Sequence, residues 1–139
     1  MVQRDVVAQK VATARARLEA AEPLFARSRD EFLAVEIERD VAVFYLFLAI
    51  QECIDLAAHW VVDEGWGPPE DAGGSFDILR DKGVLGPEHA AALRAATGLR
   101  NRIGHGYEFL DPGRTHDEYP DGSKALRRFL TIAADAAGL

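Results

Sequence analysis

Residues 41–50 read VAVFYLFLAI, an almost unbroken apolar run that contains no charged side chain. If these residues form a helix, their side chains point in every direction around its axis. Such a helix must be covered on all sides, either at the centre of a helical bundle or by a partner subunit. The run is too short to cross a bilayer, and Gln51 and Glu52 follow it directly, so we expect no membrane association.

The segment before this run carries a helical stripe and a capping signal. Pro23 is expected to end the first helix at about residue 21, and Ser28 with Glu31 has the form of a capping box. The box predicts the start of a second helix that continues through the apolar run to about Val62. The first helix is predicted over about residues 3–21. Its apolar stripe recurs at steps of four and three and runs on past Pro23, through Val7, Val11, Ala14, Leu18, Ala21 and Phe25.

The segment after the run alternates between breakers and helical patterns. Residues 63–74, DEGWGPPEDAGG, predict a loop, after which Ser75 caps a short helix that Gly83 ends. Pro87 starts a fourth helix that frays at Gly104 or Gly106. A loop, DPGRTHDEYPDGS, precedes a fifth helix from Ser123. Since no strand is needed, we predict one all-α domain over residues 1–139, an antiparallel up-and-down bundle of four to five helices.

Composition limits both the compartment and the kind of partner. The 139 residues include one cysteine, Cys53, which excludes an internal disulfide, fits a reducing compartment and is expected to be packed and inert. With no signal segment apparent, we expect a soluble cytoplasmic protein. The net charge of −7 disfavours indiscriminate binding to nucleic acid. Residues 80–128 nevertheless hold 9 Lys and Arg against 7 Asp and Glu, a net charge of +2, which leaves room for a local basic site.

Residues 99–107, LRNRIGHGY, hold the strongest chemical signal. Arg100 keeps its charge at any working pH and grips phosphate oxygens with paired N–H donors, while His105 can carry a proton near neutrality. On an ideal helix the two side chains point about 140° apart, so they do not share a face. They can converge if Gly104 unwinds the helix end, or if a two-fold-related subunit supplies a second copy of the motif.

This motif resembles the Arg-x4-His-x-Tyr signature of HEPN-domain ribonuclease toxins of the HepT kind, from type VII HepT/MntA toxin–antitoxin pairs. The resemblance extends over about residues 40–110 and includes IQECIDLAAHWVVDEGWGPPED, SFDILRDKGVL and AALRAATGLRNRIGHGY. Gly104 and Gly106 stand where the family usually has a bulky residue and often an acidic one. The resemblance implies a symmetric homodimer whose two motifs line one groove. It also implies a nucleotidyltransferase-fold antitoxin, MntA-like, that adenylylates Tyr107.

The expected activity is endoribonucleolytic cleavage of RNA, with tRNA as one candidate substrate, and it needs neither a metal nor a cofactor. His105 would take the proton from a 2′-hydroxyl while Arg100 steadies the charge that grows on the phosphate oxygens. A dimer would supply two imidazoles for the roles of base and acid. Supporting roles are expected for four further residues. Asn101 would orient Arg100 or a phosphate, and Arg102 would follow the RNA backbone by binding its phosphates. Glu52 and Asp55 would orient Arg100 or His105.

Several alternatives remain at this point. The chain could be a non-catalytic HEPN-type module that docks a nucleotidyltransferase or holds nucleotide, an alternative that the acidic net charge favours slightly. Arg100 and Asn101 could instead cap the helix end while His105 packs in the bundle. Asp55, His59 and Asp63 recur at a spacing of four and could offer metal ligands, although a solvated stripe is the simpler interpretation. Two histidines, His89 and His116, are expected at the surface, and two tryptophans, Trp60 and Trp66, are expected to pin the loop to the bundle.

Overall fold

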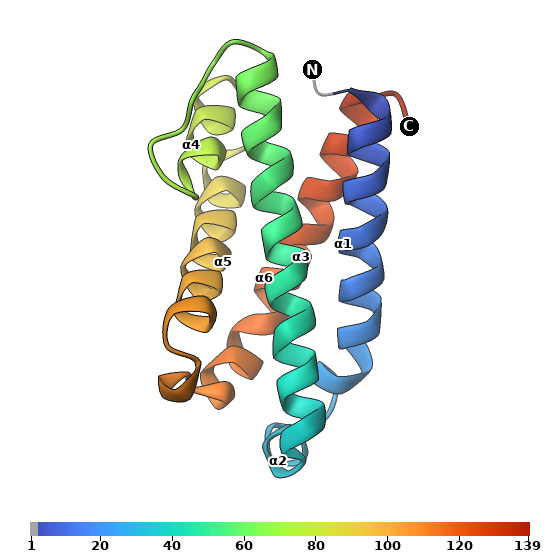
Figure 1. Cartoon of the computed structure of the whole chain (residues 1–139), viewed down its shortest axis with the longest axis vertical. Helices are drawn as coiled ribbons and strands as arrows, with labels where there is room; N and C mark the ends of the chain where they lie inside the picture. Colours follow the sequence, from blue (N-terminus) through green and yellow to red (C-terminus); the bar gives the residue numbers. More distant parts are fainter. Residues whose placement is uncertain (1–2) are drawn as a thin grey trace.

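A computed structural model, which describes residues 3–139, confirms the all-α fold. Residues 3–139 contain no strand, and the long helices run alternately up and down with both termini at the same end (Figure 1). The elements are α1 (Arg4–Phe25), α2 (Arg29–Ala34), α3 (Glu36–Asp63), α4 (Gly74–Asp81), α5 (Pro87–His105), a 3₁₀ turn η1 (Tyr107–Phe109) and α6 (Pro112–Ala136).

The first two predicted helices differ from the structure at their ends. α1 continues through Pro23 to Phe25, whose ring is buried and stacks on Tyr119 with centroids 4.0 Å apart. The predicted end at residue 21 is therefore wrong, because burial of Phe25 holds the last turn despite the missing N–H of Pro23. Ser28 does cap α2, accepting a hydrogen bond from the Glu31 N–H at 3.2 Å. The helix breaks at Val35, however, so the predicted second helix is two helices, α2 and α3.

The largest error concerns α6, which begins at Pro112 and not at Ser123. Its cap is Asp111, whose Oδ1 accepts a hydrogen bond from the Arg114 N–H at 3.1 Å. Thr115 and Tyr119 are buried and extend the helical stripe of the later residues back by two turns. The helical periodicity of this stripe was not recognised in the sequence, because its neighbours are charged and Pro120 interrupts it. Pro87 begins α5 as predicted, whereas Ser75 lies inside the first turn of α4 and does not cap it.

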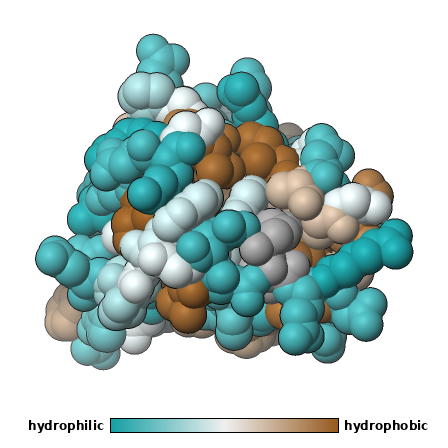
Figure 2. Space-filling view, turned by 90° about the horizontal axis from the view of Figure 1, so that it is seen from above, coloured by the Kyte–Doolittle hydropathy of each residue, from teal (hydrophilic) through white to brown (hydrophobic). Residues whose placement is uncertain are grey.

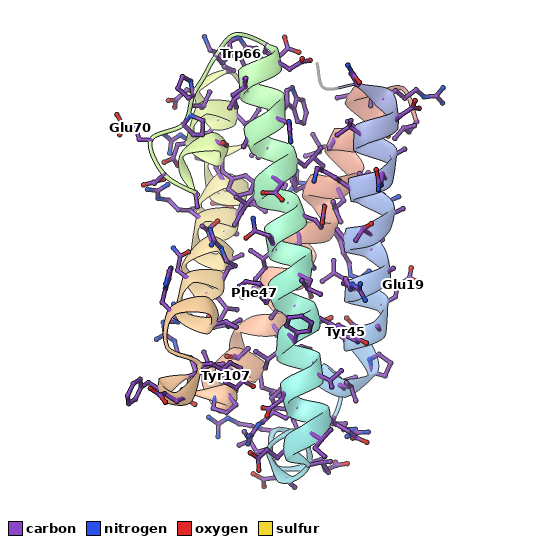
Figure 3. All side chains as sticks on the ribbon, viewed as in Figure 1. Glu19, Tyr45, Phe47, Trp66, Glu70 and Tyr107 are labelled. Atoms are coloured by element: carbon purple, nitrogen blue, oxygen red, sulfur yellow. The ribbon has the colours of Figure 1, made fainter. Side chains whose placement is uncertain are left out.

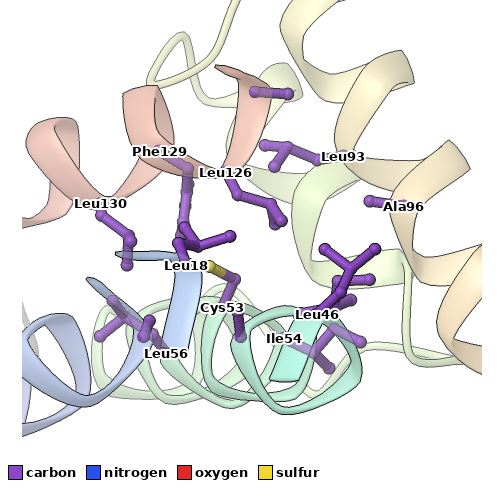
Figure 4. Close-up of a cluster of buried hydrophobic side chains, with 14 of the residues drawn as sticks. Leu18, Leu46, Cys53, Ile54, Leu56, Leu93, Ala96, Leu126, Phe129 and Leu130 are labelled. Atoms are coloured by element: carbon purple, nitrogen blue, oxygen red, sulfur yellow. The ribbon is translucent and has the colours of Figure 1, made fainter. Parts of the chain in front are cut away.

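The core forms where α3 packs against the other long helices. Leu46, Cys53 and Leu56 of α3 face α1, α5 and α6, with Leu18, Leu93, Leu126 and Phe129 opposite (Figure 4). α3 is long and apolar enough to cross a membrane, and half of its apolar window is buried inside the bundle. Seen from the end that carries the termini, the surface is mostly hydrophilic around a few apolar side chains (Figure 2).

α3 is not covered on all sides, contrary to one interpretation of its sequence. Ile37, Val41 and Phe44 follow one another along one face and remain exposed, Ile37 by 79%. Phe44 stacks on Phe47, with ring centroids 6.5 Å apart, so the exposed face leads to the half-buried Phe47 ring (Figure 3). We call Ile37, Val41 and Phe44 the α3 stripe.

Replacing Phe129 by alanine is expected to lower the free energy of unfolding by about 3–5 kcal/mol, because the ring is fully buried and its loss leaves a cavity. The ring meets Phe76 edge-on, with centroids 5.4 Å apart, and lies 6.4 Å from Trp60. Urea denaturation followed by circular dichroism measures the change. Val62→Ala is the control, since that side chain is exposed outside the α3 stripe and its loss should change stability by less than about 0.5 kcal/mol. Equal effects of the two substitutions would contradict this core assignment.

Candidate active site

The end of α5 carries the Arg-x4-His motif, and the helix stays intact through it. α5 remains helical to His105, so Gly104 does not unwind the helix and that route to convergence is wrong. A Cβ at Gly104 would lie 3.4 Å from Cε2 of Phe47, which shows how closely α5 approaches α3 here. On an intact helix Arg100 and His105 project about 140° apart, so one chain does not bring them together.

Arg100 lies on the side of α5 that faces α3. It precedes Gly104 by one turn and therefore shares the face that approaches Phe47. Its side chain is half-buried, and its Nε is buried without any hydrogen-bond partner within residues 3–139. A buried N–H group normally finds a partner. Arg100 therefore retains donor capacity that this chain does not use.

His105 opens onto a hollow of about 460 Å³ at the same end of the bundle. The ring is exposed, so the alternative in which it packs in the bundle is wrong. Asn101, one turn earlier, lines the same hollow, and Phe109 forms an apolar wall that is 86% exposed. The remaining lining residues are Arg102, Gly106, Leu110, Asp111, Arg114 and Thr115.

Two arginines of this hollow are held by one carboxylate. Arg102 Nη2 donates to Glu118 Oε2 at 2.9 Å, and Arg114 Nε donates to Glu118 Oε1 at 2.6 Å. Arg102, expected to track an RNA backbone, thus pairs within the chain. Arg114 and Glu118 were not predicted as site residues, although their spacing of four on α6 is a recognised signal for an ion pair.

Tyr107 sits in η1, directly after the motif, at the end of the bundle opposite the termini (Figure 3). Its hydroxyl donates to Asp40 Oδ1 at 2.5 Å, and Arg39 Nε donates to the same oxygen at 3.3 Å. A neighbouring hollow of about 310 Å³ is lined by these three residues and shares Leu110 with the His105 hollow. Nothing in the sequence pointed to Asp40, because contacts between α3 and η1 depend on the fold.

Burial first, and then the hydrogen bond to Asp40, raise the pKa of Tyr107 above its ordinary value. The folded state therefore favours the neutral phenol. This contribution to stability is present below the ordinary tyrosine pKa of about 10 and is lost as the pH rises through the raised pKa. At neutral pH the hydroxyl keeps its proton, and it can act as a nucleophile only if that proton leaves as the new bond forms.

Glu52 and Asp55 do not support the motif within this chain. They lie on the α1 side of α3, where Lys10 Nζ is 3.4 Å from Glu52 Oε2 and 3.9 Å from Asp55 Oδ2. Within residues 3–139 no hydrogen bond or ion pair joins either carboxylate to Arg100 or His105. The expected contact fails because these positions of α3 point away from α5.

The other side chains that the sequence singled out have structural partners. His89 is buried, with Nε2 2.8 Å from the Ala125 carbonyl oxygen, so its predicted surface position is wrong. His116 is half-buried beside Phe32, with Nε2 2.8 Å from the Arg27 carbonyl oxygen, and is likewise not a surface residue. Trp60 is buried and Trp66 packs on the core beside Lys82, as expected for residues that hold the loop.

Asp55, His59 and Asp63 do not form a metal site in the part of the chain that the structure describes. Across residues 3–139 no group of three or more His, Cys, Asp or Glu side chains is arranged to hold a metal ion. Asp55 instead accepts a hydrogen bond from Gln51 Nε2 at 2.9 Å.

Comparison with known proteins agrees with this arrangement. The family model described as ribonuclease HepT-like matches residues 15–132. The chain belongs to the HepT-like ribonuclease family. A putative RNase from Archaeoglobus fulgidus is 36% identical over 94 residues, which cover 67% of this chain and 70% of the relative. The resemblance inferred from the motif is thereby confirmed.

Solved structures show that the HepT-like chain has the fold of HEPN toxins. A tri-AMPylated HEPN toxin from Shewanella oneidensis, in complex with its MNT antitoxin, superposes with a TM-score of 0.83 at 20% identity, covering 92% of this chain and 96% of the toxin. A cytosolic protein of unknown function from Bacillus subtilis, YutE, gives a TM-score of 0.82 at 18% identity, covering 97% and 90%. At such identities the likeness concerns the fold.

Proposed function

We propose that this HepT-like chain is a metal-independent endoribonuclease that cuts RNA at a cleft between two copies of itself. The observation that carries the proposal is the solvent-exposed His105 imidazole, placed in a hollow beside arginine and asparagine side chains. Membership of a ribonuclease family supports the same reaction class. An imidazole can both remove and return a proton in acid–base catalysis.

The second copy is needed because one chain separates Arg100 from His105. The α3 stripe supplies a surface on which the second copy can pack, since exposed apolar side chains on one helix face mark an interaction site. The stripe leads past Phe47 to the side of α5 that carries Arg100. A two-fold axis near this edge would bring Arg100 of one subunit toward His105 of the other and would give its unpartnered Nε a phosphate oxygen.

The reaction then follows from the acid–base and charge properties of the two residues. His105 removes the proton of a 2′-hydroxyl, whose oxygen attacks the adjacent phosphorus while the 5′-oxygen of the next nucleotide leaves. The products are a 2′,3′-cyclic phosphate and a 5′-hydroxyl, and the same His105 imidazole, now protonated, returns the proton to the leaving oxygen. Arg100 donates to the equatorial oxygens, where negative charge grows. Asn101, in the same hollow as His105, orients the phosphate.

The sugar requirement tests this mechanism. Replacing the ribose on the 5′ side of a mapped cleavage site by 2′-deoxyribose is expected to abolish cleavage at that bond, because the attacking hydroxyl is missing. Cleavage of the all-ribose RNA should continue in excess EDTA. Gel analysis of end-labelled RNA, tRNA included, measures both results. Cleavage at the deoxy position, or a loss of activity in EDTA that added Mg²⁺ restores, would contradict the mechanism.

Regulation through Tyr107 is the second part of the proposal. A nucleotidyltransferase-fold antitoxin would transfer AMP from ATP to the Tyr107 hydroxyl, releasing pyrophosphate. The Shewanella toxin described above is tri-AMPylated in complex with an MNT antitoxin. In this chain Tyr107 is 42% exposed and lies beside the His105 hollow, so an anionic nucleotide there would repel RNA and obstruct the cleft.

A non-catalytic module that docks a nucleotidyltransferase or nucleotide is the second candidate function. One observation favours it: Glu118 pairs with both arginines of the His105 hollow, which weakens their attraction for RNA. The deoxyribose experiment separates the two candidates, since a docking module cuts neither RNA.

A further inference from the structure

On α5, His105 shares its side of the helix with Arg102 and not with Arg100. α5 is helical through His105, so the direction of Arg102 lies about 60° from that of His105, against about 140° for Arg100. Arg114 reaches the same hollow from the first turn of α6. Two guanidinium groups from separate helices therefore converge beside the imidazole.

Glu118 bridges the two guanidinium groups with one oxygen each. Arg102 Nη2 lies 2.9 Å from Oε2 and Arg114 Nε lies 2.6 Å from Oε1. A carboxylate with each oxygen on a different guanidinium occupies the kind of position that a phosphate group also fills. Neither guanidinium makes any other hydrogen bond within residues 3–139, so most of their N–H donors are available to a second anion.

We infer that Arg102 and Arg114 form an anion subsite for an RNA backbone phosphate next to the one that is cut, and that Glu118 holds this subsite closed until RNA replaces it. The inference rests on the proposed ribonuclease function for the identity of the anion. RNA is favoured over an acidic protein because the subsite and His105 share one hollow, so that an RNA strand held at His105 must pass the two arginines.

The subsite keeps a net positive charge while Glu118 is in place. With Glu118 in place, two positive charges face one carboxylate, which leaves a net charge of +1 for any anion that approaches. All three side chains are partly exposed, at 38%, 57% and 36% for Arg102, Arg114 and Glu118. Exposed ion pairs of this kind contribute little to stability, so a phosphate can displace the carboxylate at small cost. One backbone phosphate alone binds the subsite weakly. An RNA strand already held at the catalytic cleft presents that phosphate at a high effective concentration, so it binds more readily.

Binding to an RNA that cannot be cut tests the subsite apart from catalysis. The probe is a fluorescent 2′-O-methyl RNA oligonucleotide, and anisotropy measures its dissociation constant with the full chain over a range of salt concentrations. Arg114→Ala should weaken binding roughly 3- to 10-fold and lower the slope of log K against log salt by about 0.7, the value for one phosphate contact on a single strand. Arg102→Ala should do the same. Glu118→Gln should tighten binding roughly threefold or more, because it removes the competing charge and keeps the shape.

Matched controls exclude a general effect of charge. Arg94 pairs with Asp71 away from the hollow, with Arg94 Nη2 3.2 Å from Asp71 Oδ2. Arg94→Ala and Asp71→Asn change the net charge as the test variants do, and both should leave the affinity and the salt slope close to wild type. Circular dichroism verifies folding of every variant.

The outcomes separate this inference from the proposed function. If Arg114→Ala binds like Arg94→Ala, or Glu118→Gln binds like Asp71→Asn, the subsite is refuted even where the wild-type chain cuts RNA. If the binding pattern holds while the wild-type chain cuts no RNA, the subsite stands and the ribonuclease proposal fails. In the cleavage assay Arg114→Ala should raise KM far more than it lowers kcat, because its contact is present before and during the reaction. An equal loss in kcat would contradict a binding role.

Discussion

His105→Ala is expected to lower the rate of RNA cleavage by about 10²- to 10⁴-fold, because it removes the group that takes and returns the proton. The substitution should not disturb the fold, since the ring is exposed at the end of α5. Single-turnover cleavage of a labelled RNA measures the effect. His59→Ala is a suitable control, because that ring is also exposed but lies on α3, outside the hollow. Unchanged cleavage by His105→Ala would remove the mechanism.

Arg100→Ala is expected to reduce cleavage by a similar factor, and mixing it with His105→Ala tests whether the site is shared. A mixed dimer holds one complete site if Arg100 of one subunit serves His105 of the other. After denaturation together and refolding, activity should recover to about a quarter of wild type, since roughly half of the dimers are mixed and each has one complete site of two. Mixed dimers that form but stay inactive would contradict the shared cleft.

Tyr107→Phe is expected to abolish adenylylation while RNA cleavage continues. Phenylalanine keeps the ring but lacks the oxygen that would attack the α-phosphorus of ATP. Incubation with a nucleotidyltransferase-fold antitoxin and ATP should add adenylyl mass to the wild-type chain and stop its RNA cleavage, but should do neither to Tyr107→Phe. Intact-mass spectrometry and the cleavage assay follow the two effects.

Tyr45→Phe is the matched control for this experiment. Its ring lies on α3 against the Arg17 guanidinium, 5.4 Å from the ring centroid, and its loss should leave modification unchanged. Adenylyl mass on the Tyr107→Phe chain would contradict the assignment of the acceptor. A wild-type chain that stays unmodified would remove this route of regulation without touching the cleavage mechanism.

The sequence predicts the helical bundle because most segments show the apolar periodicity of a helix and are bounded by Pro or Gly. As predicted, the apolar run at residues 41–50 lies in a long helix, Ser28 caps a helix and Pro87 starts one. The prediction failed where tertiary contacts outweigh local signals. Phe25 extends α1 beyond Pro23, and extended backbone at Val35 separates α2 from α3. α6 starts at Pro112, capped by Asp111, although polar residues and Pro120 made that segment resemble a loop.

For the candidate site, the sequence identifies the motif but not its surroundings. The spacing of Arg100 and His105 already predicts that one straight helix keeps them apart, and α5 is helical throughout. The close approach of α5 to α3 at Gly104 could not be predicted, because Phe47 lies far away in the sequence. The contact of Asp40 with Tyr107 and the placement of Glu52 and Asp55 beside Lys10 depend in the same way on which helices become neighbours.

The burial of Cys53 has a practical consequence for studying this protein. Its thiol is the only one in the chain, is fully buried in α3, and has a pKa raised chiefly by that burial. Alkylating reagents act on thiolates, so native Cys53 should stay unlabelled in the folded protein. Glu108→Cys would therefore place a single dye or spin label on the exposed turn beside the cleft, without first removing the natural cysteine. Distances between two such labels would report directly how the copies pair in solution.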